Sequence, residues 1–115
     1  MISKPVFLQG IYGFEGAGID KPTTLHPDLS YTVPAGITTQ PLYFRGGNST
    51  DELVTIVLLR DGSPMRYFPI GARASTHVAL AVVENIEDGT LLELQVAARE
   101  NLAGTVVVDL GLVEV

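Results

Sequence analysis

The stretch Glu52–Ile70, with the sequence ELVTIVLLRDGSPMRYFPI, decides the fold. Two apolar runs flank the dipeptide Asp61-Gly62, and the second run carries Met65, Tyr67 and Phe68. An Asp-Gly pair between such runs is typical of a β-hairpin, because the turn needs positive φ angles that glycine adopts without a steric clash at Cβ. We therefore predict a hairpin at the centre of an antiparallel β-sandwich.

The first arm of this hairpin, residues 52–60, is apolar on both of its faces. Alternate side chains of a strand point to opposite sides. Val54, Ile56 and Leu58 share one side, and Leu53, Val57 and Leu59 share the other. A strand with this pattern is covered on both sides, and in a two-layer sandwich we expect the second cover to be another subunit or a long loop.

Short apolar runs separated by turn residues continue on either side of the hairpin. Residues 90–96 (TLLELQV) alternate most cleanly, which places Leu92, Leu94 and Val96 inside. The other runs that we expect to form strands are 5–9, 29–33, 41–45, 76–82 and 105–115. About eight strands and no helix predict one all-β domain, 1–115, folded as an antiparallel β-sandwich with Ig-like or jelly-roll topology.

Residues 10–28 show neither a helical nor a strand period, and they contain four glycines and two prolines. We interpret them as an irregular loop, because a structureless segment of this length in a compact domain usually binds something or packs on itself. The loop supplies most of the candidate ligand-binding residues, which are Tyr12, Phe14, Glu15 and His26, with Arg45 from a later turn.

The charge and composition exclude several classes of partner. The net charge is −6, which disfavours nucleic acid and anionic membrane surfaces, since both bind through Lys and Arg. No apolar run is long enough to span a bilayer, so we expect no membrane insertion. The N-terminal run lacks the pattern of a signal peptide, and the chain has no cysteine, so we expect a cytoplasmic protein.

No set of residues has the spacing of a catalytic or metal site. His26 and His77 are the two histidines, whereas a single-chain metal site usually needs three or more ligands. Ser75, Thr76 and His77 are neighbours on a predicted strand, so adjacent side chains point to opposite faces and do not form a relay. We therefore expect no enzyme activity, no metal and no cofactor.

The surface is expected to be partly buried by a second copy of the chain. Charged residues make up 17% of the sequence, below the roughly 25% usual for globular domains. The candidate oligomer interface is the outer side of the hairpin arm with small apolar residues of later strands, namely Leu53, Val57, Leu59, Ala79, Ala81 and Val107.

Four segments in the C-terminal two-thirds carry a resemblance to a known family. They are the acidic loop Gly47–Glu52, the turn Asp61–Pro64, the stretch Pro69–Val78 and the final hairpin 90–108. Their order resembles that of the sensory rhodopsin transducer-like family of small bacterial β-sandwich proteins. The resemblance implies a non-enzymatic homo-oligomeric binding or adaptor protein with a role in signalling. The alternative is a small-molecule or carbohydrate-binding module, or an accessory subunit of an enzyme, with its site in the 10–28 loop.

Overall fold

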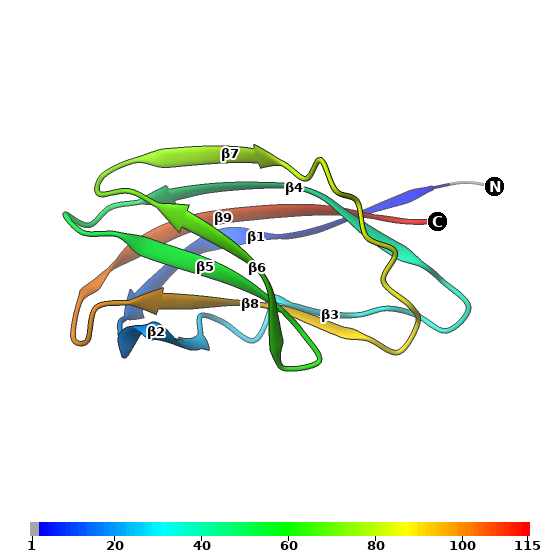
Figure 1. Cartoon of the computed structure of the whole chain (residues 1–115), viewed down its shortest axis with the longest axis horizontal. Helices are drawn as coiled ribbons and strands as arrows, with labels where there is room; N and C mark the ends of the chain where they lie inside the picture. Colours follow the sequence, from blue (N-terminus) through cyan, green and yellow to red (C-terminus); the bar gives the residue numbers. More distant parts are fainter. Residues whose placement is uncertain (1–2) are drawn as a thin grey trace.

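Nine strands in residues 3–115 of the computed structural model form two antiparallel sheets that pack face to face (Figure 1). Sheet A has the order β1 (Lys4–Glu15), β9 (Ala103–Glu114), β4 (Thr39–Asn48) and β7 (Ser75–Ala79). Sheet B has the order β2 (Gly18–Thr24), β8 (Leu91–Ala98), β5 (Val54–Arg60) and β6 (Ser63–Ile70), and β3 (Ser30–Thr32) also pairs with β8. The predicted all-β antiparallel sandwich is confirmed. Met1 and Ile2 of the predicted domain lie outside the described residues.

The hairpin predicted at Asp61-Gly62 joins β5 to β6. Because β6 is the last strand of sheet B, this hairpin lies at the edge of its sheet, whereas the sequence analysis predicts it at the centre. Its two turn residues have φ angles of 49° and 82°, and Arg60 pairs with Ser63 across them. Positive φ at both positions is the geometry that Asp-Gly favours in a two-residue turn.

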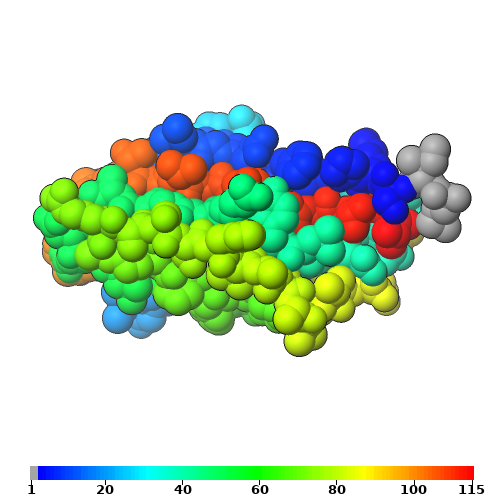
Figure 2. Space-filling model, turned by 90° about the horizontal axis from the view of Figure 1, so that it is seen from above, coloured from blue at the N-terminus to red at the C-terminus, as the bar shows by residue number. Residues whose placement is uncertain are grey.

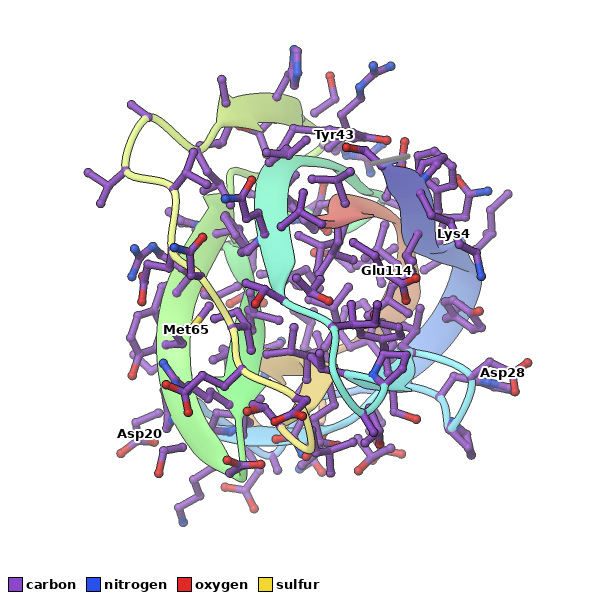
Figure 3. All side chains as sticks on the ribbon, turned by 90° about the vertical axis from the view of Figure 1, so that its right-hand side faces the viewer. Lys4, Asp20, Asp28, Tyr43, Met65 and Glu114 are labelled. Carbon is purple, nitrogen blue, oxygen red and sulfur yellow. The ribbon has the colours of Figure 1, made fainter. Side chains whose placement is uncertain are left out.

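The space between the sheets is filled by side chains from alternate positions of the strands (Figure 3). Leu92, Leu94 and Val96 of β8 are buried there, as the alternation predicts. Phe44 of sheet A and Phe68 of sheet B stack with ring centroids 4.3 Å apart and planes 8° from parallel. This aromatic pair ties the two layers together at the middle of the core.

The interpretation of residues 10–28 as an irregular loop is wrong, because β1 runs to Glu15 and β2 spans Gly18–Thr24. The glycines that hide the strand period are used for close approach. The Tyr12 ring covers Gly10, where a Cβ would lie 2.6 Å from the Tyr12 hydroxyl, and a Cβ at Gly16 would lie 2.1 Å from a backbone oxygen of Arg99. Aromatic cover of a glycine is a known way to keep such a position in a strand. Pro22 is accommodated because β2 is at an edge of its sheet.

Strand structure accounts for all the regular elements of residues 3–115, and this part of the chain has no helix long and apolar enough to cross a membrane.

Candidate functional site

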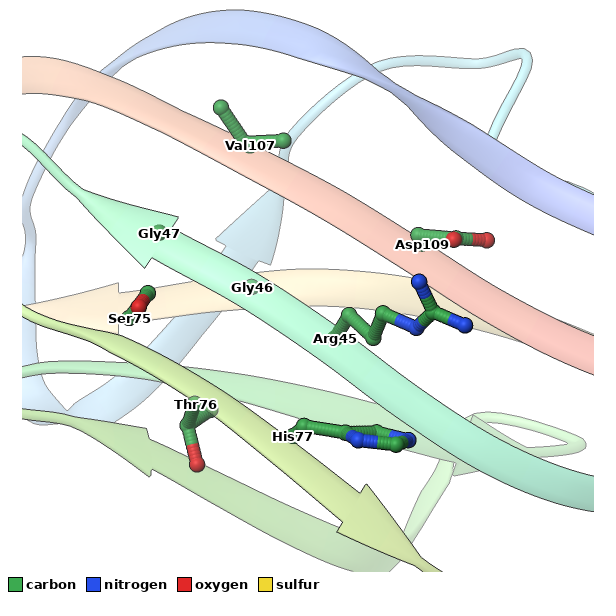
Figure 4. Close-up of a pocket in the computed structure, with 8 residues that line it drawn as sticks. All are labelled: Arg45, Gly46, Gly47, Ser75, Thr76, His77, Val107 and Asp109. Carbon is green, nitrogen blue, oxygen red and sulfur yellow. The ribbon is translucent and has the colours of Figure 1, made fainter.

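The outer face of sheet A is hollowed across its strands. One hollow of about 630 Å³ crosses β7, β4 and β9 (Figure 4). Its lining residues are Arg45, Gly46, Gly47, Ser75, Thr76, His77, Val107 and Asp109. A second hollow of about 380 Å³ continues over β9 to β1 and shares Val107 and Asp109 with the first. We call the two together the sheet A trough. Figure 2 shows the face on which it lies, with β1, β9, β4 and β7 side by side in that order.

A row of polar side chains crosses all four strands of this trough. The strand register places Gln9 opposite Asp109, Asp109 opposite Arg45, and Arg45 opposite His77. Residues opposite each other in antiparallel strands point to the same face of the sheet, with Cβ atoms roughly 5 Å apart. The trough therefore presents an amide, a carboxylate, a guanidinium and an imidazole in one line, and Figure 4 shows the last three extending in the same direction.

A second row of the trough, one pleat away, is apolar and exposed. Ile11, Val107 and Gly47 share this row by register. The exposed fractions of Ile11 and Val107 are 71% and 47%, and Phe7 is 50% exposed on the other side of the polar row. Uncovered apolar side chains of this size next to polar groups are typical of binding surfaces.

Tyr43 organises the charged groups at the centre of the polar row. Its hydroxyl donates to Asp109 Oδ1 at 3.1 Å, and the Arg45 guanidinium carbon lies 5.1 Å from its ring centroid. The ring crosses Gly111, where a Cβ would lie 1.9 Å from Tyr43 Cε2. Partial burial, followed by the bond to Asp109, raises the pKa of Tyr43 above its usual value, so this hydroxyl stays a donor at neutral pH.

The guanidinium of Arg45 has no carboxylate within 4 Å among the described residues, although Asp109 is its cross-strand neighbour. The three arginine ion pairs of the structure bring Arg66, Arg73 and Arg99 to acidic partners. Arg45 therefore keeps its donors available to a ligand, while the Asp109 carboxylate keeps acceptor capacity beyond its one bond from Tyr43.

The structure brings together some of the ligand-binding residues expected from the sequence and separates others. Tyr12 and His26 stack with centroids 4.9 Å apart, and His26 Nδ1 accepts from the Asp28 N–H at 3.0 Å. Phe14 points to the same side of β1 as Tyr12 and packs against the core. Glu15 ends β1 on the opposite side, and Arg45 alone lies in the trough.

The predicted oligomer interface does not form one surface. Val57 and Leu59 lie on sheet B and are buried within the single chain, with Ala97 beside them. Ala79 and Val107 lie on the outer face of sheet A, Ala81 follows β7, and Leu53 precedes β5. The reason is that β5 belongs to one sheet while β7 and β9 belong to the other.

The sequence analysis does not predict that Gln9, Tyr43 and Asp109 lie together with Arg45. The sequence does indicate that each of these residues lies in a strand. Their alignment depends on the register between strands that are up to a hundred residues apart, and no local pattern encodes that register. His77 is exposed in the trough, on the edge strand β7 of sheet A.

The His, Cys, Asp and Glu side chains of the described residues do not form a recognisable metal centre. No three His, Cys, Asp or Glu side chains between residues 3 and 115 gather closely enough to hold a metal ion.

Comparison with known proteins rests on structure alone. No protein-family model matches the chain, and no curated protein matches it. The CBM36-1 domain of a multidomain xylanase from the hindgut metagenome of Trinervitermes trinervoides superposes with a TM-score of 0.61, at 16% identity, over 96% of this chain and 96% of that one.

Two further solved structures are similar. A carbohydrate-binding module CBM36 in complex with calcium and xylotriose has a TM-score of 0.58 at 16% identity, over 94% of this chain and 97% of its own. A chain in the structure of infectious bursal disease virus, Gt strain, has a TM-score of 0.52 at 10% identity, and this protein covers 97% of itself but 32% of that chain. At these identities the likeness establishes a shared β-sandwich fold, and the resemblance to the sensory rhodopsin transducer-like family stays a prediction.

Proposed function

We propose that the protein is a non-catalytic carbohydrate-binding domain and that the sheet A trough holds the sugar chain. The observation that carries this proposal is the polar row Gln9–Asp109–Arg45–His77 lying between exposed apolar side chains. The similarity of the whole chain to two carbohydrate-binding modules supports the same class of ligand.

The chemistry of a sugar ring matches the two kinds of row. A pyranose carries hydroxyl groups around its rim and C–H groups on its faces. The guanidinium of Arg45 donates to hydroxyl oxygens and the Asp109 carboxylate accepts from hydroxyl hydrogens, and such charge-assisted bonds are about twice as strong as neutral ones. The side chains of Ile11, Val107 and Phe7 offer apolar surface to the C–H groups.

The length of the trough favours an oligosaccharide over a single sugar. It crosses four strands spaced about 4.8 Å apart, so the outer strands β1 and β7 lie roughly 14 Å apart along it. A ligand that spans this distance contacts both the Gln9 end and the His77 end.

Binding without hydrolysis follows from the single carboxylate of the trough. Glycoside hydrolysis usually needs two carboxyl groups about 5–10 Å apart on either side of the scissile bond. Asp109 is the one acidic side chain among the residues that line the two hollows.

One of the similar modules was solved with calcium, but the side chains of this protein do not fit that metal, since residues 3–115 contain no group of three His, Cys, Asp or Glu side chains that could hold a metal ion. The proposal therefore places all sugar contacts on protein groups, and a chelator should leave binding unchanged.

The test is isothermal titration calorimetry, in which the protein is titrated with xylo-oligosaccharides and with a panel of other soluble oligosaccharides. Arg45→Ala and Asp109→Ala should each weaken binding by about 10- to 100-fold, because each removes hydrogen bonds to a charged group worth about 1.5–3 kcal/mol. Arg60→Ala and Glu100→Ala, charge-matched variants outside the trough, should bind like the unmodified protein. Absence of saturable binding to every oligosaccharide, or equal losses in all four variants, would refute the proposal.

A further inference from the structure

The outer face of sheet B carries a second concavity, on the side of the molecule opposite the trough. It has a volume of about 410 Å³ and runs between β2 and β6 above the central strands. We call it the sheet B groove. Figure 3 shows the separation, since Asp20 at this groove and Tyr43 at the trough lie on opposite sides of the molecule.

The walls of the groove are made of prolines and exposed apolar side chains. Pro64, Tyr67 and Pro69 come from β6, and Ile19 and Pro22 come from β2. Tyr67 is 62% exposed and Ile19 is 71% exposed, so both present apolar surface that nothing in the described part of the chain covers. The proline side chains add apolar surface without adding any N–H donor.

The floor of the groove explains the two-sided apolar pattern of residues 52–60. Val57 is buried at the floor together with Ala97, outside the core between the sheets. The backbone groups of β5, the floor strand that carries Val57, are paired with β6 on one side and β8 on the other. A ligand strand therefore cannot pair with this floor strand, and the free edges of sheet B are the outer sides of β2 and β6.

The groove has few polar groups, and one of them is charged. Among its lining side chains, hydrogen bonding is left to the hydroxyls of Thr55 and Tyr67 and to the Asp20 carboxylate. An oligosaccharide, which carries hydroxyl groups along its whole length, would leave most of them without protein partners. A ligand with apolar side chains and a self-sufficient, solvated backbone suits this surface better.

We propose that the sheet B groove binds a proline-rich peptide segment that carries a basic residue. A polyproline II helix makes no internal hydrogen bonds and keeps its backbone in water while it presents apolar side chains. Grooves lined by aromatic side chains recognise such segments through apolar contacts and a small number of hydrogen bonds. The negative charge of Asp20, in a chain of net charge −6, selects a Lys or Arg next to the prolines.

The experiment is a fluorescence polarisation titration with a labelled proline-rich peptide that has an arginine at each end. We expect saturable binding with a Kd below about 1 mM, about 10-fold weaker binding for Tyr67→Ala, and a smaller salt dependence for Asp20→Asn. A peptide of the same length with glycine in place of proline should bind more weakly, because it must lose more conformational entropy. Leu53→Ala, which truncates another exposed apolar side chain outside the groove, is the control.

Several results would overturn this proposal. One is that the proline-rich peptide shows no saturable binding up to about 1 mM. Another is that Tyr67→Ala and Leu53→Ala weaken peptide binding equally. A dimer in light scattering that Tyr67→Ala dissociates would show that a second copy occupies the groove. Loss of oligosaccharide binding in Tyr67→Ala, with Arg45→Ala unaffected, would place the sugar on sheet B and refute both assignments. Sugar binding lost only through Arg45 and Asp109, with no peptide bound, would refute this inference and leave the proposed function intact.

Discussion

Substitution of Val57 by aspartate distinguishes the buried floor of sheet B from a subunit interface. The sequence pattern predicts that Val57→Asp dissociates an oligomer and stays folded. The structure predicts that it strongly destabilises the fold, because Val57 is fully buried and packs with Leu59 and Ala97.

The magnitude follows from two terms. Loss of the buried valine side chain removes about 1.5–2 kcal/mol. The buried carboxyl group has no partner and stays protonated in the folded state, which at about pH 7 costs up to about 4 kcal/mol, or 1.36 kcal/mol for each pH unit above the ordinary aspartate pKa of about 3.9. The sum of about 4–6 kcal/mol is a large part of the roughly 5–15 kcal/mol that stabilises a domain.

The assay is urea unfolding followed by circular dichroism, with Val107→Asp as the matched control. Val107 is 47% exposed on sheet A, so this control should lose less than about 1 kcal/mol. Burial would raise the folded-state pKa of the carboxyl group introduced by Val57→Asp. The difference between the variants should therefore be largest near about pH 7 and shrink toward about pH 4. A Val57→Asp protein as stable as the control, with only its oligomeric state changed, would refute the reasoning.

Three further predictions concern the core, a tyrosine and assembly. Phe44→Ala should destabilise the fold by about 3–5 kcal/mol. A double-mutant cycle with Phe68→Ala should give an interaction free energy of about 0.5–1.5 kcal/mol between the two rings. An interaction free energy near zero would contradict the stacked pair between the sheets. Burial and the bond to Glu114 raise the pKa of Tyr31, so its stabilisation is present below the ordinary tyrosine pKa of about 10 and is lost as pH rises through the higher folded value. Tyr31→Phe should remove that alkaline loss in unfolding experiments, and an unchanged profile would contradict it. Self-association stays a prediction from the low charge content, and light scattering of the unmodified protein should show an oligomer; a monomer at every concentration would exclude it.

The sequence was sufficient for the fold class because its strongest signals are local. The Asp61-Gly62 turn and the alternation of Leu92, Leu94 and Val96 depend on neighbours within a few residues, and the structure confirms both. The interpretation of residues 10–28 as a loop is wrong because glycines at positions such as Gly10 remove the apolar side chain that would mark the strand. The Tyr12 ring, from two residues further along the chain, covers Gly10 instead.

Most of the candidate site could not be predicted from the sequence, because it depends on pairing between strands that are far apart in the chain. Arg45 was recognised as a candidate, but its partners Gln9 and Asp109 are aligned with it only by the β1–β9–β4 register. The pattern of residues 52–60 correctly predicts that Val57 is buried, but it predicts another subunit or a long loop as the cover. In the structure Val57 lies beneath side chains of β2 and β6, and the sequence does not indicate that these two strands flank it.

The most direct test of the central claim is an amide NMR titration of the protein with xylo-oligosaccharides and other oligosaccharides. The account predicts that resonance shifts gather on β9 and β4 around Asp109 and Arg45, extend to Gln9 and His77, and leave the amides of sheet B unchanged. Shifts confined to sheet B or to the loops at the ends of the sandwich, or no shifts with any sugar, would contradict it.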